Sequence, residues 1–302
     1  MVEQFEGLRP RLFSIAYRML SSASEAEDVV QDAFLRYDQA RPAELRSAAA
    51  WLTAVVTNLC LDRLKSARAQ RERYVGPWLP EPVLTGAAAG SGTVAGAGLG
   101  ALGPLETAEQ RESVSFAFLL LLERLNARER AVFVLREAFA YGYDEIAAIL
   151  GLSEANCRQL YHRARQHVTE ERVRFEPSPR RRRELGDRFI AAAEGGDLAA
   201  LEALFAEDMT VWADGGGKVA AARRPLVGTA DVLRFLSGLA TGRYAGTFTL
   251  RVAELNGAPA MLVLLGGKMD TACAFEMEGG RITALRVVRN PDKLAFLARQ
   301  LG

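Results

Sequence analysis

Four polar side chains near the start of this 302-residue chain recur at helical spacing: Asp28, Gln31, Asp32 and Arg36. They belong to a predicted helix, residues 25–37, whose opposite side is apolar. Carboxylates on the wet face of a helix form either an ordinary solvated face or a site for a partner, and this segment alone does not decide between the two. Ser24 followed by Glu27 predicts a capping box at the start of this helix.

A second predicted helix, residues 48–69, interleaves aromatic, amide and basic side chains. Together with the loop before it, the helix offers six candidate DNA contacts: Arg46, Ser47, Trp51, Asn58, Arg63 and Lys65. Bases stack on aromatic rings and phosphates pair with cations, so this set suits melted single-stranded DNA. Two alternatives stay open, because Trp51 also suits a protein core and Arg63 has Asp62 and other acids nearby as ion-pair partners.

Residues 143–160 have the pattern of a helix-turn-helix. Ala147 is small enough to let two helices approach closely, Gly151 suits the turn, and Ser153 can cap the second helix. Cys157 faces the first helix and is expected to be a buried thiol. The outward side of the second helix carries six polar side chains: Asn156, Arg158, Gln159, His162, Arg163 and Arg165. Asn, Gln and Arg read base edges bidentately, which favours DNA reading over a plain hairpin with a basic face.

Composition narrows the classes of function. A net charge of +1 means that DNA binding must rest on local basic patches. Three cysteines without a CxxC pair indicate a reducing cytoplasm and argue against a disulfide or zinc framework. With two histidines, an imidazole-rich metal site is not expected, and we predict no metal and no cofactor. No apolar run reaches the roughly 20 residues that span a bilayer, and no secretory signal is evident, so no membrane partner is predicted.

The chain divides into four segments by pattern. Residues 1–76 and 106–177 read as two all-α modules, and residues 180–302 as an α+β domain. Residues 77–105 read as a linker, because 13 of the 18 residues from Gly86 to Gly103 are Gly or Ala. Such a stretch cannot bury enough side chain to offset its ordering entropy.

The α+β segment begins with helical patterns and ends with alternating ones. Two amphipathic helices are predicted around residues 185–190 and 198–205, a short strand at 210–213, and a helix at 231–239. Four strands follow, at 247–254, 260–265, 268–277 and 281–288, separated by Asn-Gly and Gly-Gly pairs that are typical of hairpins. This order predicts helices on one face of a curved antiparallel sheet.

Three short motifs stand out from the surrounding sequence: Trp78–Pro82, Asp214–Lys218 and Asn290–Leu294. Asp214–Lys218 places three glycines and two opposite charges at the end of a predicted strand. Asn290–Leu294 starts the last predicted helix, and its Pro291 would lie in the first turn, where proline is favoured. Nine of their residues are candidate regulatory contacts: Trp78, Pro80, Glu81, Asp214, Gly216, Lys218, Asn290, Asp292 and Lys293.

At this point the chain resembles a known family. Residues 5–75 resemble region 2, and residues 106–175 resemble region 4, of extracytoplasmic-function sigma factors, with no region 3 between them. The motifs that carry the resemblance are Glu27–Phe34, Ala50–Leu52 with Asn58 and Asp62–Arg63, and Leu160–Arg165. The three short motifs are similar to those of the subgroup with a fused SnoaL-like C-terminal domain, a cone-shaped α+β fold.

The resemblance implies an alternative sigma factor and not an enzyme. Its partners would be core RNA polymerase, through the β′ and β subunits, and promoter DNA. The acidic helix would dock on the coiled coil of β′. The loop at 41–47 and the helix after it would read and melt the −10 element, and the second helix of the helix-turn-helix would read the −35 element. The linker would follow the RNA path of the polymerase.

We hypothesise that the three motifs dock together and make the C-terminal domain a built-in modulator, in place of a separate anti-sigma protein. Alternatively, each motif is merely a local cap or turn. A different class is a one-component regulator that binds duplex DNA and senses a ligand, but it would not use the acidic helix. An enzyme fused to a DNA-binding module would need a base and an oxyanion donor. Asp214, Asp270 and Tyr244 are candidates, but no paired constellation is visible, and a small ligand in the cone stays an open partner.

Overall fold

The structure is a computed structural model that describes residues 2–40, 47–85, 113–169, 179–238 and 248–301. The chain forms two compact units. One combines Met1–Arg73 with Ala101–Val173, and the other combines Tyr74–Gly100 with Arg174–Gly302. The first unit is all-α and the second is α+β, which confirms the predicted fold class. No helix in the described part of the chain combines the length and apolarity needed for a bilayer crossing.

Three helices form the N-terminal part of the all-α unit: α1 (Val2–Leu20), α2 (Ala23–Gln39) and α3 (Ala48–Glu72). They pack pairwise around a shared apolar core. Helix α2 begins earlier than predicted, because its N-cap is Ser22, whose Oγ accepts a hydrogen bond from the Glu25 amide at 3.2 Å. The prediction that Ser24 is the cap is therefore wrong. The chain turns sharply at Ser21, with φ 55°, and this turn places Ser24 inside the first helical turn.

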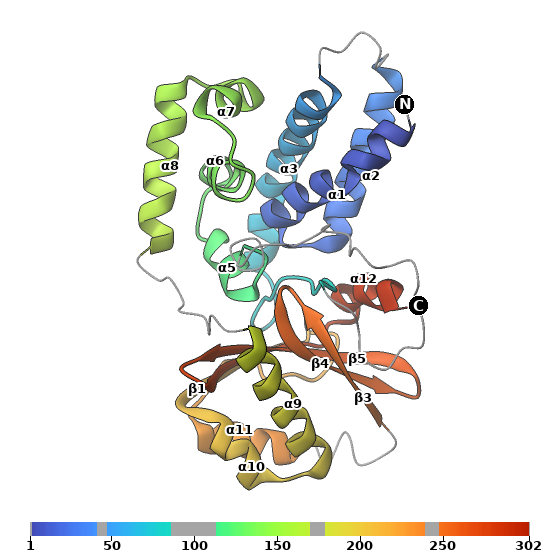
Figure 1. The fold of residues 1–302 in the computed structure, drawn as a ribbon, viewed down its shortest axis with the longest axis vertical. Helices are drawn as coiled ribbons and strands as arrows, with labels where there is room; N and C mark the ends of the chain where they lie inside the picture. The colour runs from blue at the N-terminus through green and yellow to red at the C-terminus, as the bar shows by residue number, and fades with distance from the viewer. Residues whose placement is uncertain (1, 41–46, 86–112, 170–178, 239–247, 302) are drawn as a thin grey trace. The chain divides into compact units, whose positions relative to one another are not determined.

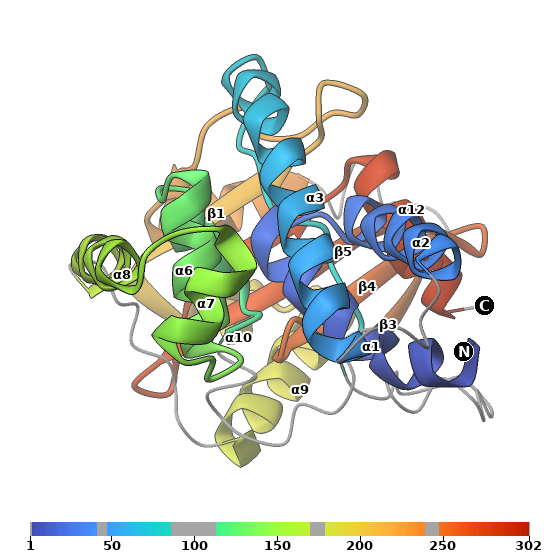
Figure 2. The same cartoon turned by 90° about the horizontal axis from the view of Figure 1, so that it is seen from above.

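Four helices form the rest of the all-α unit: α5 (Phe116–Leu122), α6 (Ala127–Glu137), α7 (Tyr143–Leu150) and α8 (Glu154–Thr169). Asn126 and Glu129 form a reciprocal capping box at the start of α6. Helix α3 runs beside α6 and α7 (Figure 2), so the two helical modules share one packed unit.

A six-stranded sheet is the framework of the second unit. Its strands are β1 (Phe205–Asp214), β2 (Leu226–Val227), β3 (Phe248–Leu255), β4 (Ala258–Leu265), β5 (Lys268–Glu278) and β6 (Arg281–Val288). The spatial order is β2-β1-β6-β5-β4-β3. The β3–β6 meander is antiparallel as predicted, with positive φ in its Asn-Gly and Gly-Gly turns, whereas β1 joins β6 in parallel.

Helices cover both faces of this sheet. Figure 1 shows α9 (Pro179–Gly195), α10 (Leu198–Leu204) and α11 (Thr229–Gly238) on one face and α12 (Pro291–Leu301) on the other. The expectation of helices on one face therefore holds for three of them, but α12 crosses to the second face.

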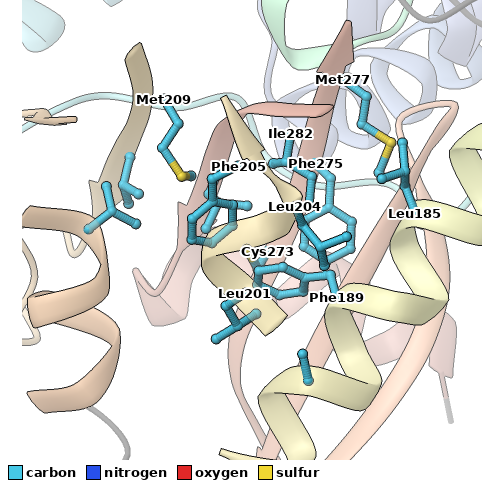
Figure 3. Close-up of a cluster of buried hydrophobic side chains, with 14 of the residues drawn as sticks. Leu185, Phe189, Leu201, Leu204, Phe205, Met209, Cys273, Phe275, Met277 and Ile282 are labelled. Carbon is cyan, nitrogen blue, oxygen red and sulfur yellow. The ribbon is translucent and has the colours of Figure 1, made fainter. Parts of the chain in front are cut away.

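Aromatic side chains fill the space between α9–α10 and the sheet (Figure 3). The ring of Phe189 on α9 lies 4.7 Å from that of Phe275 on β5 and 6.1 Å from that of Phe205 on β1, measured between centroids. All three are almost fully buried. Burying each such ring stabilises the fold by about 1.5–3 kcal/mol, so this face is a core.

Residues 74–85 are an integral part of the α+β unit, although residues 74–76 were predicted as the end of the first all-α module and residues 77–85 as the start of the linker. Leu84 forms an isolated antiparallel bridge with Leu255 at the end of β3. The Thr85 amide donates to Glu254 O at 2.9 Å, and the Asn256 amide donates to Val83 O at 3.0 Å. These bonds extend the sheet edge by a short piece of chain that lies far away in sequence.

Candidate functional site

The polar face of α2 has the exposure that a docking surface needs. Asp28, Gln31 and Arg36 are exposed, and Asp32 is partly exposed. Leu35, which the sequence reasoning missed, is 53% exposed on the same helix and falls one turn after Gln31 and Asp32. An apolar side chain amid these charges adds area that a protein partner can bury.

Arg63 on α3 links to this acidic face. Its Nη2 donates to Asp32 Oδ2 at 3.1 Å, and its Nη1 lies 3.6 Å from Asp28 Oδ2. Nη1 also donates to the backbone oxygen of Glu25 at 3.0 Å, so the guanidinium is held by three groups of α2. The sequence left open whether Arg63 pairs with Asp62, but Asp62 accepts from Lys65 at 2.7 Å instead. That hydrogen bond holds the pKa of Asp62 below its usual range.

The other predicted −10 contacts lie along α3. Ser47 precedes the helix, is exposed, and accepts from the Ala50 amide at 3.2 Å. Trp51 is half-buried, and its ring centroid lies 6.2 Å from that of Tyr37, so part of its side chain packs in the core. Asn58 is exposed, as is Lys65. Arg46 lies outside the described residues.

The helix-turn-helix is confirmed in α7 and α8. Gly151 ends α7 in the left-handed region at φ 63°, a conformation that favours glycine. Ser153 Oγ accepts from the Asn156 amide at 3.3 Å, which caps α8 as predicted. Cys157 is buried between the helices, and burial raises the pKa of its thiol.

The outward side of α8 presents the predicted reading residues. Five of the six are exposed, namely Arg158, Gln159, His162, Arg163 and Arg165, and Asn156 is half-buried. Arg158 is braced by Glu154 at 2.8 Å and by the ring of Tyr143, 5.2 Å from its Cζ. Arg163 Nε lies 3.7 Å from Glu129 Oε1. These contacts orient two of the cations before any nucleic acid is bound.

The three short motifs of the α+β unit meet at Asp214, which is fully buried at the end of β1. Its Oδ1 accepts from Tyr74 Oη at 2.5 Å and from the Gly216 amide at 3.1 Å. Its Oδ2 accepts from the Leu79 amide at 2.8 Å and from Lys293 Nζ at 2.7 Å. Each carboxylate oxygen thus accepts two hydrogen bonds, and a buried charge needs such hydrogen bonds to offset its loss of hydration.

Lys293 and Asn290 complete this arrangement, which we call the Asp214 cluster: Tyr74, Trp78, Leu79, Asp214, Gly216, Asn290 and Lys293. The ammonium of Lys293 also donates to Leu79 O and lies 4.2 Å from the centre of the Trp78 ring. Asn290 Nδ2 donates to Tyr74 Oη at 2.8 Å. Burial, together with the bond to Asp214, raises the pKa of Tyr74, which keeps its hydroxyl protonated as a donor.

Around the Asp214 cluster, the remaining motif residues differ in exposure. Pro80 and Glu81 are buried. Lys218 and Asp292 form an ion pair outside the cluster, with side chains that are 53% and 64% exposed. The Asp292 amide donates to Asn290 Oδ1 at 3.1 Å, which caps α12. The structure therefore brings all three motifs together. The connection passes through Leu79, which lies in a motif but was not among the candidate contacts, and through Tyr74, which the sequence reasoning did not single out.

The candidate catalytic acids are both engaged in structural contacts. Asp214 has the four donors described above. Asp270 Oδ2 accepts from Thr271 Oγ1 at 2.8 Å and lies 3.7 Å from Arg289 Nε. Tyr244, the candidate oxyanion donor, lies outside the described residues. Within the described residues, no three His, Cys, Asp or Glu side chains gather as a metal site would require.

Family models match two parts of the chain. The model of Sigma-70 region 2 matches residues 4–70, and the model of Sigma-70 region 4 matches residues 115–168. The first match covers α1–α3, with the acidic face and Arg63. The second covers α5–α7 and nearly all of α8, with the helix-turn-helix.

Similarity to curated proteins extends over both units. The ECF RNA polymerase sigma factor SigJ of Mycobacterium tuberculosis is 38% identical, over 97% of this chain and 92% of its own. The probable ECF RNA polymerase sigma factor SigI of the same species is 33% identical, over 97% and 94%. The crystal structure of M. tuberculosis SigJ superposes with a TM-score of 0.74 and 35% identity, and 98% of each chain is covered. This chain therefore belongs to the extracytoplasmic-function (ECF) family of RNA polymerase sigma factors.

Proposed function

We propose that this sigma factor binds core RNA polymerase in the cytoplasm through α2, reads the promoter through α3 and α8, and is modulated by its own α+β unit. The observation that carries the proposal is the similarity to ECF sigma factors over 97% of the chain, because it includes the two DNA-reading modules and the fused unit together. The placement of exposed acids on α2 and exposed bases on α8 supports the division of roles.

Docking on the polymerase is assigned to the acidic face of α2, opposite basic groups on the β′ coiled coil. Arg63 orients Asp28 and Asp32, because it holds both carboxylates and the backbone before them. An oriented acid pair loses less side-chain entropy on binding than two free side chains. Contacts with β would come from the chain that joins the two helical modules.

Promoter reading is assigned to two helices. On α3, Ser47, Trp51, Asn58 and Lys65, together with Arg46 before it, would bind the melted −10 strand, where capturing an unstacked base repays the few kcal/mol of unpairing. On α8, the exposed residues nearest its N-terminus would read the −35 duplex in the major groove, as recognition helices do.

Modulation is assigned to the Asp214 cluster through its hold on residues 74–85. This segment follows directly on α3 and precedes the connection to the second module. Anchoring about 12 residues removes up to roughly 40 Å of reach from that connection, at about 3.3–3.6 Å per extended residue. The α+β unit would thereby limit how far the two DNA-reading modules separate, with no chemistry of its own and no ligand required.

The first experiment adds the purified chain to core RNA polymerase and measures initiation from promoters upstream of its own gene and its neighbours. We expect initiation from a cognate promoter. The double substitution Asp28→Lys with Asp32→Lys should abolish core binding, because it reverses the charge of the docking face. Glu3→Lys with Glu6→Lys is the matched control, because both are exposed acids on α1, outside the docking helix. Equal binding by both variants would refute the docking assignment.

A second experiment tests promoter reading. Gln159→Ala should weaken binding to the cognate −35 duplex by roughly 1–3 kcal/mol and relax base preference there. Gln166→Ala is its matched control, since Gln166 is exposed on α8 about 10 Å further from the N-terminus. If both variants keep the wild-type preference, or both lose it equally, the reading assignment fails. A chain that neither binds core nor initiates would instead favour the ligand-sensing regulator of duplex DNA.

A further inference from the structure

A pocket of about 370 Å³ lies between α12 and the sheet of the α+β unit, on the face opposite α9–α11 (Figure 1). The sheet forms one wall of this pocket through Leu264 on β4 and Met269 on β5. The other wall is an apolar stripe on one side of α12, which includes Leu294, Ala295, Ala298 and Leu301. The two alanines of this stripe are short, so α12 does not fill the space above the strands.

The two faces of the sheet differ in how tightly they are packed. Against α9 and α10, the rings of Phe189, Phe205 and Phe275 fill the space and form a core (Figure 3). Against α12, the short side chains leave room for a small molecule. The pocket is therefore separate from the core under α9–α11, which is the side of the cone where the sequence left a small ligand open.

The charges at this pocket are all positive. Among the described residues that line it, two are cations and none is an acid: Arg251 on β3 is half-buried, and Lys268 at the start of β5 is exposed. Neither forms a hydrogen bond or an ion pair with another described residue. An unpaired cation beside an apolar wall attracts an anion more strongly than one in open water, because the local dielectric constant is lower.

An apolar wall with cations at one end fits an amphipathic anion. Pockets that bind small molecules are mostly apolar, with a few polar groups that fix the orientation of the ligand. At about 30 Å³ per non-hydrogen atom, the volume of a water molecule in the liquid, this pocket holds about a dozen atoms. We propose that it binds a medium-chain carboxylate such as decanoate, with the carboxylate on the two cations and the acyl chain against the leucines of α12 and β4. A guanidinium suits this role because it can donate two parallel hydrogen bonds to a carboxylate.

Helix α12 connects this pocket with the Asp214 cluster. Leu294 lines the pocket, and Lys293 directly before it donates to Asp214 Oδ2 at 2.7 Å. A ligand that binds only the folded unit stabilises it, by an amount that grows with ligand concentration. Decanoate would therefore hold α12 against the sheet and strengthen the hold of the cluster on residues 74–85. Its effect on initiation rests on the proposed function, whereas its binding does not.

Isothermal titration calorimetry of the full chain with dissolved decanoate tests the pocket. We expect a single site per chain, and binding that weakens roughly fourfold for each CH₂ removed from the acyl chain. Decanol has the same chain without the charge and should bind roughly tenfold more weakly, because it cannot pair with the cations. Arg251→Gln should weaken decanoate binding by a similar factor. Arg299→Gln is the matched control, since Arg299 is an exposed cation on α12 that does not line the pocket.

Ala298→Phe tests the apolar wall and guards against a folding defect. Ala298 is exposed, so a phenyl ring at this position would fill the pocket from the solvent side without entering the core. The variant should lose decanoate binding and keep the helical circular dichroism spectrum of the wild type. Ala230→Phe, at an exposed alanine on α11, is the matched control.

Three results would overturn the proposal: equal affinity for decanol and decanoate, wild-type binding in both Arg251→Gln and Ala298→Phe, or no binding by the wild type. Binding to phosphatidylglycerol vesicles without binding to dissolved decanoate would overturn it in favour of a membrane surface. If the chain binds decanoate but never initiates transcription with core polymerase, the proposed function fails and the assignment of the pocket stands.

Discussion

Each of the two units has a carboxylate that connects several elements, and the surroundings of these two carboxylates differ in charge balance. Asp214 in the α+β unit is 0% exposed and has one cation, Lys293, together with three neutral donors. Glu123 in the all-α unit is 15% exposed and faces two cations, Arg71 and Arg130, which also rely on main-chain carbonyls. The charges of Asp214 and Lys293 cancel, and both oxygens of Asp214 accept hydrogen bonds. The Glu123 site carries an excess positive charge.

The difference lies in the number of cations that each carboxylate has to balance. The Asp214 cluster joins segments around 74–79, 214–216 and 290–293 within one compact unit, and each oxygen of the Asp214 carboxylate accepts two hydrogen bonds. At Glu123, the guanidinium groups of Arg71 and Arg130 share one carboxylate and repel each other. Removing the carboxylate would leave one cation without its counter-ion at Asp214 and two at Glu123.

The largest effect is expected for Asp214→Asn. The substitution leaves the Lys293 ammonium buried without its counter-ion, which costs about 3–5 kcal/mol when one partner of a buried pair is removed. Urea unfolding of the full chain measures the loss, in a Trp51→Phe background that leaves Trp78 and Trp212 as the two fluorescent tryptophans. Asp208→Asn, an exposed acid on the same strand, is the matched control. Adding Lys293→Met to Asp214→Asn should restore part of the loss, and an unchanged midpoint for Asp214→Asn would contradict the comparison.

A smaller effect is expected for Gly216→Ala. Gly216 has φ 58°, and a Cβ there would lie 2.2 Å from Asn290 Nδ2 and 2.9 Å from Tyr74 Oη. Strain and overpacking together should cost about 1–3 kcal/mol in the same unfolding assay. Gly266→Ala separates the two causes, since Gly266 has φ 54° with nothing within 4 Å of the added Cβ. Equal losses at both positions would mean that backbone strain, and not contact with the cluster, explains the result.

Local patterns made the helical modules readable from the sequence. The turn at Gly151 and the cap at Ser153 depend on neighbours within a few residues, and both are found in the structure. The α2 cap shows the limit of such reasoning. Ser22 and Ser24 are equally plausible caps by type, and the choice depends on the positive φ of Ser21.

Long-range contacts were harder to predict from the sequence than local caps and turns. The three short motifs were visible because glycines, prolines and charges cluster in them, but their connection passes through Tyr74 Oη and the Leu79 amide. A main-chain donor can belong to any residue, so the residue type does not predict such a contact. The contacts of Arg71 and Arg130 were missed for the same reason, since these arginines donate to the carbonyls of Leu20 and Met19, which carry no side-chain signature.

Arg63 is an intermediate case between a buried and an exposed charge. Its side chain is 28% exposed and holds Asp28 and Asp32. Arg63→Met should weaken core polymerase binding by about 1 kcal/mol, roughly fivefold in Kd, because the acids lose their orientation but keep their charge. Lys65→Met is the matched control, since Lys65 pairs with Asp62 and is 74% exposed. Loss of −10 DNA binding with unchanged core affinity would instead assign Arg63 to the promoter.

The smallest effect is expected at the exposed pair beside the Asp214 cluster. Lys218 and Asp292 are both more than half exposed, so water and salt screen their attraction. Lys218→Met should change the stability of the α+β unit by less than about 1 kcal/mol, and 0.5 M salt should erase the difference from wild type. The Lys218–Asp292 pair and the Lys293–Asp214 pair both join a Lys to an Asp, and they differ in burial. A loss at Lys218 as large as that of Asp214→Asn would show that burial is not the property that separates them, and that the glycine loop itself carries the stability of the cluster.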